Sequence, residues 1–126
     1  MSPGATFDTG GLIALDRNNR QVIVLVVRAT EVGARITIPA TALAQAIRRP
    51  ERQARLSRLI RQPNTDVIAL DRVDSTSVGR LLNASATDDI VDAHVVVCAR
   101  RAGQQVLTSD PDDVRRLDPQ LTVVAV

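Results

Sequence analysis

Four aspartates of the chain stand where predicted strands end or predicted helices begin. Asp8 ends an apolar strand, and Asp110 follows a second one. Asp89 and Asp92 lie on the first turn of the longest predicted helix, and residues three apart on a helix share one side. Clustered carboxylates raise one another's pKa unless a cation lies between them, and Mg²⁺ or Mn²⁺ is the natural cation for an all-oxygen site. Such a site can activate water and stabilise the charge on a phosphodiester during in-line attack.

Each of these carboxylates also has a purely structural explanation, because an acidic residue at a helix N-terminus caps free amides and suits the helix dipole. Asp8 favours the chemical explanation, since it ends an apolar strand and no arginine lies close to it in sequence. The neighbouring hydroxyls of Thr9 and Ser109 either orient a bound water or cap the next helix. Asp112 and Asp113 are interpreted as surface acids, with Asp113 the better candidate for an outer position around the site.

His94, the single histidine, and Cys98, the single cysteine, are interpreted as structural residues. His94 stands two residues after Asp92 and therefore about 200° away around the helix. Cys98 lies one turn further along, and one cysteine allows neither an intramolecular disulfide nor a cysteine zinc cluster.

Strands and helices are expected to alternate along the whole chain, which we interpret as one domain over residues 1–126. After a Pro3-Gly4 turn signal, we predict strands at 5–8, 35–38, 67–70, 105–108 and 121–124. Helices are predicted at 10–15, 20–32, 40–47, 51–62, from Asp74 or Ser75 to 82, from 88 or 89 to 102, and at 110–117. Thr9 is the predicted N-cap of the first helix, and a buried strand at 22–27 is the alternative to the second. This alternation predicts a three-layer α/β/α fold with a central, mostly parallel sheet, whose sites form beyond the carboxyl ends of the strands.

The composition excludes several function classes. All 16 basic residues are arginine, so the chain cannot use a P-loop lysine, a Schiff base or a lysine-assisted phospho-aspartate site. Phe7 is the one aromatic residue, so any binding of nucleic acid must rest on ionic contacts and not on stacking of bases against aromatic side chains. The longest apolar run, Val22 to Val27, is far short of the roughly 20 residues that span a bilayer, and the start lacks the features of a signal peptide. We therefore expect a cytoplasmic protein without a membrane partner.

A cluster of arginines lies between residues 48 and 61. Six arginines and Glu51 give this segment a local charge of +5. The arginines are Arg48, Arg49, Arg52, Arg55, Arg58 and Arg61. The first four are candidate RNA-binding residues, because arginines contact backbone phosphates while carboxylates surround a metal. The alternatives are a solvated helix face or a surface for an acidic partner chain.

Three short motifs, in the correct order, resemble the PIN-domain family of metal-dependent ribonucleases and especially its VapC-like toxins. They are FDTGGL at 7–12, DIVDAH at 89–94 and VLTSD at 106–110, and the resemblance covers essentially the whole chain. The resemblance implies a PIN-like fold in which Asp8, Asp92 and Asp110 bind Mg²⁺ (or Mn²⁺). It also implies that Asp89 is a further ligand or holds a water, so these four are the candidate catalytic residues.

Gln45 departs from the pattern of the family. Many PIN domains carry a glutamate on the helix after the second strand, and the matching position in PATALAQ at 39–45 is Gln45. A glutamine can ligate Mg²⁺ or hold a water, but it adds no negative charge and is no base at neutral pH. Weaker metal binding and reduced activity are the expected consequences.

The sequence thus predicts a metal-dependent endoribonuclease, the toxin of a toxin–antitoxin pair, with RNA as substrate, an antitoxin protein as partner and a homodimeric state. One alternative is a PIN-fold binding or regulatory protein with weak or no nuclease activity, for which Gln45 is the motivating residue. A receiver-like phosphoacceptor also gathers aspartates at strand ends, but its usual lysine is missing from this chain.

Overall fold

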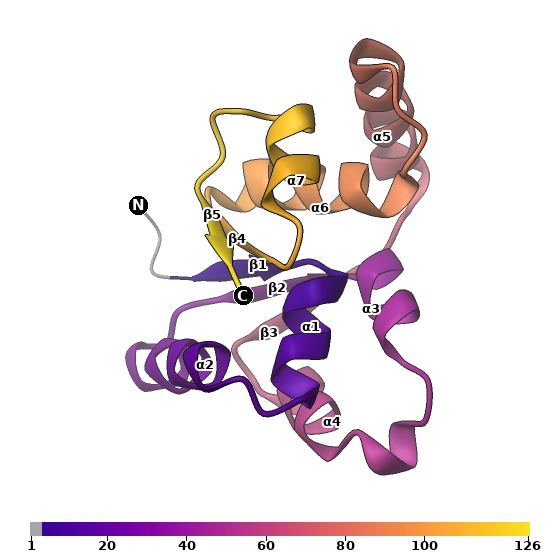
Figure 1. The fold of residues 1–126 in the computed structure, drawn as a ribbon. Helices are drawn as coiled ribbons and strands as arrows, with labels where there is room; N and C mark the ends of the chain where they lie inside the picture. Colours follow the sequence, from indigo (N-terminus) through magenta and orange to yellow (C-terminus); the bar gives the residue numbers. More distant parts are fainter. Residues whose placement is uncertain (1–3) are drawn as a thin grey trace.

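A five-stranded sheet forms the centre of the computed structural model, which describes residues 4–126 (Figure 1). All neighbouring strands are parallel, in the order β3-β2-β1-β4-β5. The strands are β1 (Ala5–Phe7), β2 (Ile36–Pro39), β3 (Thr65–Ile68), β4 (Gln105–Thr108) and β5 (Val123–Ala125). The turn expected at Pro3-Gly4 lies partly outside the described residues.

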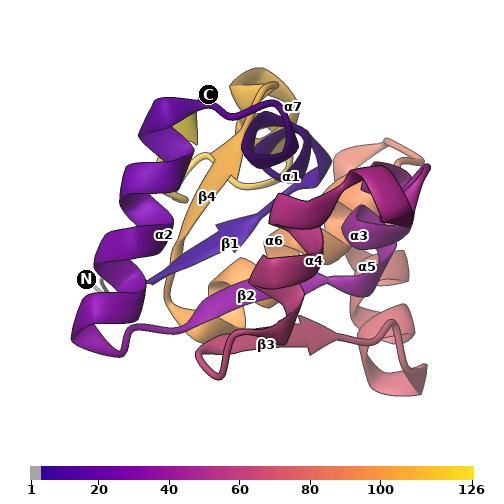
Figure 2. The same ribbon diagram turned by 90° about the horizontal axis from the view of Figure 1, so that it is seen from below.

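Helices cover both faces of this sheet, which confirms the predicted three-layer α/β/α architecture. One face carries α1 (Thr9–Asp16), α2 (Arg20–Val32), α3 (Ala40–Ala46) and α4 (Ala54–Arg61), with a 3-10 turn η1 (Pro50–Arg52) between the last two (Figures 1 and 2). The other face carries α5 (Arg72–Ser85), α6 (Ile90–Ala102) and α7 (Pro111–Leu117). The buried apolar side chains of both layers and of the sheet form one hydrophobic cluster.

The strand order places a topological switch point between β1 and β4. The chain builds β2 and β3 on one side of β1 and then returns to add β4 and β5 on the other side. In open parallel sheets, ligands bind in the crevice beyond the carboxyl ends of the strands at such a point. Phe7 is paired with Leu107, so the residues that follow, Asp8 and Thr108, stand opposite each other at this edge.

The predicted helix at 20–32 is confirmed at both ends, and the alternative strand at 22–27 is wrong. The Asn19 side chain accepts a hydrogen bond from the amide of Val22 and begins the helix, and Gly33 ends it with the positive φ that glycine favours. Val22, Val26 and Ala29 are buried along one stripe. The helical spacing of the apolar residues therefore outweighed their β-branching.

Several predicted boundaries were wrong. β3 lies two residues earlier than the predicted strand at 67–70, because pairing of Ile36 with Thr65 sets its register at the sheet edge. β5 is likewise shifted from 121–124, by its pairing with β4. The helix expected at 51–62 is divided into η1 and α4 at Gln53, whose side chain bonds the main chain of Arg48 and Arg49.

Two predicted helix caps were also wrong. Asp8, and not Thr9, caps α1, since a carboxylate oxygen of Asp8 accepts a hydrogen bond from the Gly11 amide. Asp71, and not Asp74 or Ser75, caps α5, because it accepts from the Asp74 amide. Asp74 is instead buried within α5.

Within the described residues, no helix combines the length and apolarity needed to cross a membrane.

Candidate active site

Asp8 lies at the carboxyl end of β1 and is almost fully buried, with 7% of its surface exposed. One carboxylate oxygen caps α1 through the Gly11 amide, at 2.9 Å. Burial is the main cause that raises the pKa of Asp8, and the charge of Asp110 adds to it. Hydrogen bonds from the Thr108 hydroxyl and from the main chain of Gly10 and Gly11 act in the opposite direction. Asp8 is therefore a buried carboxylate whose charge is only partly compensated.

Thr108 connects Asp8 to Asp110 across the switch point. Its hydroxyl is hydrogen bonded to the Asp8 carboxylate and accepts a hydrogen bond from the Asp110 amide at 2.9 Å. Asp110 precedes α7 without using its side chain as a cap, so its carboxylate is free for other contacts. A hydrogen bond between the side chains of Asp110 and Asp113 raises the pKa of Asp113, because two carboxylates bond each other only by sharing a proton. This contact supports the outer position predicted for Asp113.

Asp92 lies at the electrostatic centre of the group. Burial raises its pKa to about 7, with contributions from Asp89, Asp113, Asp8 and Asp110, in that order. Asp89 caps α6 by accepting a hydrogen bond from the Asp92 amide at 2.9 Å, so Asp92 lies on the first turn as predicted, whereas Asp89 lies at the N-cap just before it. The cavity beside them has a volume of about 150 Å³ and is lined by Thr87, Asp88, Asp89, Asp92, Asp113, Arg116 and Leu117.

The structure thus gathers five carboxylates at the end of the sheet into what we call the acidic cluster, formed by Asp8, Asp89, Asp92, Asp110 and Asp113. Like charges in a partly buried space favour bound protons or a cation. Among the described residues, one group of three potential metal ligands has its ligand atoms all within 4.8 Å of one another. This group consists of Asp74, His94 and Cys98. The acidic cluster is therefore a looser arrangement than that group, which lies elsewhere.

Two glycines that the sequence reasoning did not single out bring α1 against β4. A Cβ atom on Gly10 would lie 2.0 Å from the Ser109 hydroxyl oxygen and 2.7 Å from the Ser109 nitrogen. A Cβ atom on Gly11 would lie 2.8 Å from the carbonyl oxygen of Leu107. The helix that Asp8 caps can approach the segment before Asp110 only because these side chains are absent. The two consecutive glycines after the Asp8-Thr9 pair were the available signal.

Gln45 lies on α3 and contacts Thr9. The Thr9 hydroxyl donates a hydrogen bond to the side-chain oxygen of Gln45 at 2.9 Å. Because Thr9 follows Asp8 directly, Gln45 contacts a residue that is adjacent in sequence to a member of the acidic cluster. The Thr9 hydroxyl is thus bonded to Gln45, and the Ser109 side chain lies against Gly10. The two hydroxyl residues that the sequence singled out therefore flank Asp8 and Asp110.

The predicted RNA-binding arginines lie apart from the acidic cluster. Arg48 bonds the main-chain carbonyls of Ala44 and Ile47, and Arg55 reaches the carbonyl of Asp16. Figure 1 shows the η1 and α4 segment below the sheet, whereas α6 and α7 lie above it. The arginine that acts on the acidic cluster is Arg116 of α7, which lowers the pKa of Asp113 and which the sequence reasoning did not select.

His94 and Cys98 lie on the opposite side of α6 from the acidic cluster, as their helical positions predicted. Both are buried, with 0% and 2% of their surfaces exposed. The Nδ1 atom of His94 is hydrogen bonded to the Thr41 hydroxyl at 2.7 Å, and its Nε2 atom faces Asp74 of α5.

Comparison with solved structures identifies the fold. The chain is similar to one described as VapBC2 from Rickettsia felis bound to a DNA fragment from their promoter, with a TM-score of 0.69 and 13% identity over 98% of each chain. It is also similar to one described as FitAB bound to an IR36 DNA fragment, with a TM-score of 0.65, 12% identity and coverage of 96% and 94%. The chain has a PIN-like, VapC-like fold. No protein-family model matches it, and no curated protein matches it in sequence.

The raised pKa of Asp92 predicts how the stability of the chain without divalent ions depends on pH. In the unfolded chain Asp92 loses its proton near its ordinary value of 3.8, and in the folded chain only near 7. Between these values the folded state binds more protons, so stability contributed by Asp92 is present below about pH 4 and is lost as the pH rises to about 7. Asp92→Asn should remove this loss, which we expect to be on the order of 2 kcal/mol for a partly solvated group.

Urea unfolding in EDTA at several pH values between 4 and 7.5 measures this difference. The exposed Asp112→Asn variant, on the first turn of α7, is the control and should keep the pH dependence of the unmutated chain. Parallel curves for Asp92→Asn and the unmutated chain would contradict the prediction.

Proposed function

We propose that this chain is a Mg²⁺- or Mn²⁺-dependent endoribonuclease whose active site is the acidic cluster. The observation that carries the proposal is the convergence of five aspartates from β1, α6, α7 and their flanking turns on the switch point between β1 and β4. Structural carboxylates are normally paired with cations or spread apart, whereas here Asp92 is surrounded by four like charges. Carboxylates in such a position match a site that binds metal ions.

The donor set fits a hard divalent cation. Its side-chain oxygens come from aspartates alone, and Mg²⁺ and Mn²⁺ prefer oxygen ligands. We propose that Asp8, Asp92 and Asp110 hold the ion, that Asp89 stands beside them, and that Asp113 acts through its contact with Asp110. When bound, the ion would lower the pKa of a water and stabilise the charge that develops on the phosphodiester.

The residues of the chain have separate tasks in this proposal. Asp8 is fixed by hydrogen bonds from the Gly11 amide and the Thr108 hydroxyl, which hold its carboxylate at the end of β1. In the chain without a metal, burial and four neighbouring carboxylates raise the pKa of Asp92 to about 7, and a bound cation would offset these like charges, which suits a ligand of the ion. The arginines at 48, 49, 52 and 55 are proposed to bind RNA phosphates at a distance from the cleavage site.

We further propose that the chain is the toxin of a toxin–antitoxin pair, with an antitoxin as protein partner, a homodimeric state and a cytoplasmic location. Two solved structures that share its fold are described as VapBC2 and FitAB complexes bound to DNA fragments. Co-expression with the product of the neighbouring reading frame, followed by purification of a complex, tests the partner. Growth arrest that this second product relieves would support the toxin assignment.

Cleavage of RNA by the purified chain tests the enzymatic proposal directly. A mixture of structured and single-stranded RNAs should be cut in Mg²⁺ or Mn²⁺ and remain intact in EDTA. Cleavage that persists in EDTA, or none in either ion at any concentration, would contradict the proposal.

Replacing Gln45 with glutamate separates an active enzyme from a binding protein with weak turnover. A carboxylate at position 45 can accept the same Thr9 hydrogen bond while adding a negative charge beside Thr9, the residue that follows Asp8. We expect Gln45→Glu to tighten Mn²⁺ binding roughly 10-fold and to raise cleavage at low metal concentration, as changes around a metal site commonly do. Without metal the same charge should slightly lower the melting temperature. Metal titration and thermal unfolding measure the two effects, and no change in either would place residue 45 outside the site.

A further inference from the structure

We propose that Asp74, His94 and Cys98 form a second metal site, which binds Zn²⁺ and joins α5 to α6. Each of the three residues offers one potential ligand atom, namely an Asp74 carboxylate oxygen, a His94 ring nitrogen and the Cys98 sulfur, and these atoms all lie within 4.8 Å of one another. All three residues are buried, with at most 2% of the surface exposed. This group, called the buried triad below, shares no residue with the acidic cluster, so the proposal does not depend on the proposed nuclease function.

Two buried polar atoms of the triad face each other, and within the described residues neither makes a hydrogen bond of good geometry. They are the Nε2 atom of His94 and the second carboxylate oxygen, Oδ2, of Asp74. An unsatisfied buried polar atom is destabilising by about 1–3 kcal/mol, so native structures rarely leave two of them side by side. A bound cation would satisfy both.

The separation of these two atoms fits a tetrahedral ion better than a hydrogen bond. They lie 3.4 Å apart, beyond the usual 2.7–3.2 Å of a hydrogen bond. With zinc bonds of about 2.0–2.2 Å to nitrogen and oxygen, two ligands of a tetrahedral ion lie about 3.4 Å apart. Edges that include sulfur are about 3.6 Å, so a bound ion would hold the Cys98 sulfur at about that distance from the other two ligand atoms.

Neighbouring side chains hold the ligands in the way that metal sites require. The Nδ1 atom of His94 is bonded to the Thr41 hydroxyl, which leaves Nε2 directed at the triad. The other Asp74 oxygen accepts a hydrogen bond from Arg101. Metal-binding histidines and carboxylates normally have such outer partners, which fix the ring orientation and the charge.

The ligand types favour Zn²⁺ over the ion expected at the acidic cluster. One nitrogen, one sulfur and one oxygen suit a tetrahedral, borderline-soft cation, whereas Mg²⁺ needs six oxygens. Burial raises the pKa of the Cys98 thiol to about 11, so the sulfur carries its proton until a cation replaces it. Binding would then form a zinc–sulfur bond and release that proton to the solvent. Arg101, which bonds Asp74, has a side chain that is 55% exposed, so the triad lies one side chain away from solvent.

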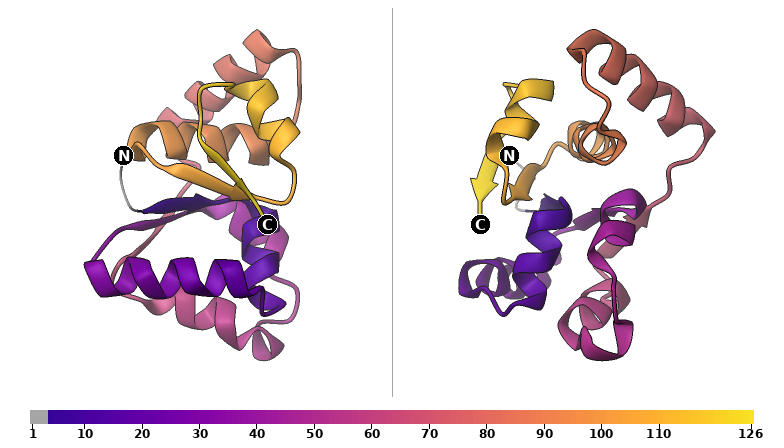
Figure 3. Two further views of the ribbon diagram at one scale, coloured as in Figure 1. Left: turned by 60° about the vertical axis from the view of Figure 1, so that its left-hand side comes forward. Right: turned by 45° about the vertical axis from the view of Figure 1, so that its right-hand side comes forward.

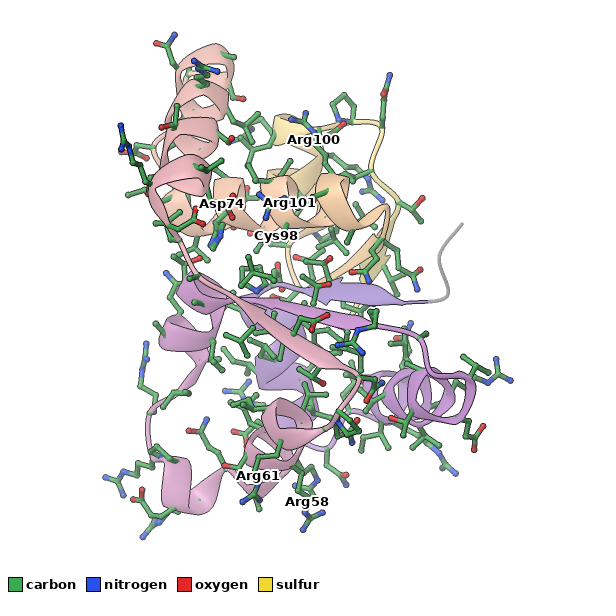
Figure 4. The ribbon with its side chains drawn as sticks, turned by 180° about the vertical axis from the view of Figure 1, so that it is seen from behind. Arg58, Arg61, Asp74, Cys98, Arg100 and Arg101 are labelled. Carbon is green, nitrogen blue, oxygen red and sulfur yellow. The ribbon has the colours of Figure 1, made fainter. Side chains whose placement is uncertain are left out.

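The position of the buried triad explains what a metal would do there. Figure 4 shows Asp74 on α5 close to Cys98 and Arg101 on α6, on the opposite side of the sheet from Arg58 and Arg61. Of the fourteen residues of α5, only Asp74 and Val78 are buried, and the helix projects from the body of the molecule (Figure 3). Because Val78 and the partly buried Leu81 and Leu82 are the apolar side chains of α5 that pack against the core, a metal bond between the two helices would add to a limited attachment.

Titration with Co²⁺ in excess Mg²⁺ tests the site on the full chain, because Mg²⁺ occupies oxygen sites and Co²⁺ reports a thiolate ligand by its charge-transfer absorption. We expect one equivalent of Co²⁺ to bind with this absorption and to be displaced by Zn²⁺. Cys98→Ser should abolish the absorption, and Asp74→Asn should weaken binding at least 10-fold. Asp71→Asn, at the N-cap of α5 and outside the triad, and Asp92→Asn, in the acidic cluster, should both leave the absorption unchanged. Cobalt binding without the absorption, or an absorption that survives Cys98→Ser, would overturn the proposal.

A second measurement avoids substitutions in the core. Zn²⁺ at about 100 times its Kd should raise the melting temperature of the unmutated chain by about 10 °C. Mg²⁺ should not bind the triad and so should not produce this increase there. Zn²⁺ should also slow the reaction of the Cys98 thiol with a disulfide reagent and protect α5 from proteolysis. If Zn²⁺ changes neither thiol reactivity nor proteolysis, the buried triad is not a metal site.

Discussion

Asp8→Asn is expected to reduce RNA cleavage at least 10²- to 10³-fold while the chain remains folded. The substitution removes one negative charge from the proposed metal site with almost no change in volume, and electrostatic groups at a reacting centre commonly contribute this much to the rate. Asparagine can still accept the Gly11 amide hydrogen bond and cap α1. Because the pKa of Asp8 is raised by burial, losing its charge should leave the melting temperature unchanged or increase it. Cleavage rate and thermal unfolding of the same preparation measure the two effects.

Asp71→Asn is the matched control for this prediction. Asp71 caps α5 as Asp8 caps α1, with nearly the same backbone angles of −82° and −173° against −84° and −178°. The control therefore makes the same chemical change at the same kind of helix start, outside the acidic cluster. It should keep full cleavage activity. Equal rates for Asp8→Asn and the unmutated chain would remove Asp8 from the site, and equal losses in both variants would indicate a general effect on folding.

Local patterns in the sequence predicted the elements that position the candidate site. Gly103 ends α6 with a positive φ, and Asp89 begins it with a side-chain cap, as the spacing of apolar residues between them indicated. The alternation of such helices with short apolar strands was sufficient to predict a parallel sheet. Since the carboxyl ends of the strands meet at one edge of such a sheet, the sequence pattern alone indicated that Asp8 and Asp110 lie near each other.

Contacts between distant segments were not predictable in this way. Asp74 was predicted as a possible helix cap, and its actual partners, His94 and Arg101, are 20 and 27 residues further along the chain. Thr108 was predicted only as a strand residue, and its contact with Asp8 depends on the register between β1 and β4. Register is set by the whole sheet, so a hydroxyl that bridges two aspartates leaves no mark in the local sequence.

The close approach of two backbone segments is also difficult to predict from sequence. Gly10 shows how large the effect of such an approach on stability and cleavage can be. Gly10→Ala should destabilise the chain by about 2–3 kcal/mol, because the new methyl group would lie 2.0 Å from the Ser109 hydroxyl oxygen and 2.7 Å from the Ser109 nitrogen. The hydroxyl can rotate away, but the nitrogen belongs to the backbone and moves only with the turn before Asp110. We therefore expect cleavage to fall about 10²-fold as well, since displacements of about 1 Å at a reacting centre have effects of that size.

Gly79→Ala is the matched control, because Gly79 lies within α5 and a Cβ atom there would meet nothing within 4 Å. In that open position alanine has the higher helix propensity, so the control should stabilise the chain by about 0.5–1 kcal/mol. Urea unfolding of both variants should thus give changes of opposite sign. Adding Ser109→Gly to Gly10→Ala removes the hydroxyl contact but not the backbone contact, and should restore only part of the lost stability. If Gly10→Ala were as stable as Gly79→Ala, α1 would not be held against the β4 end, and the positions of Asp8 and Asp110 would need another explanation.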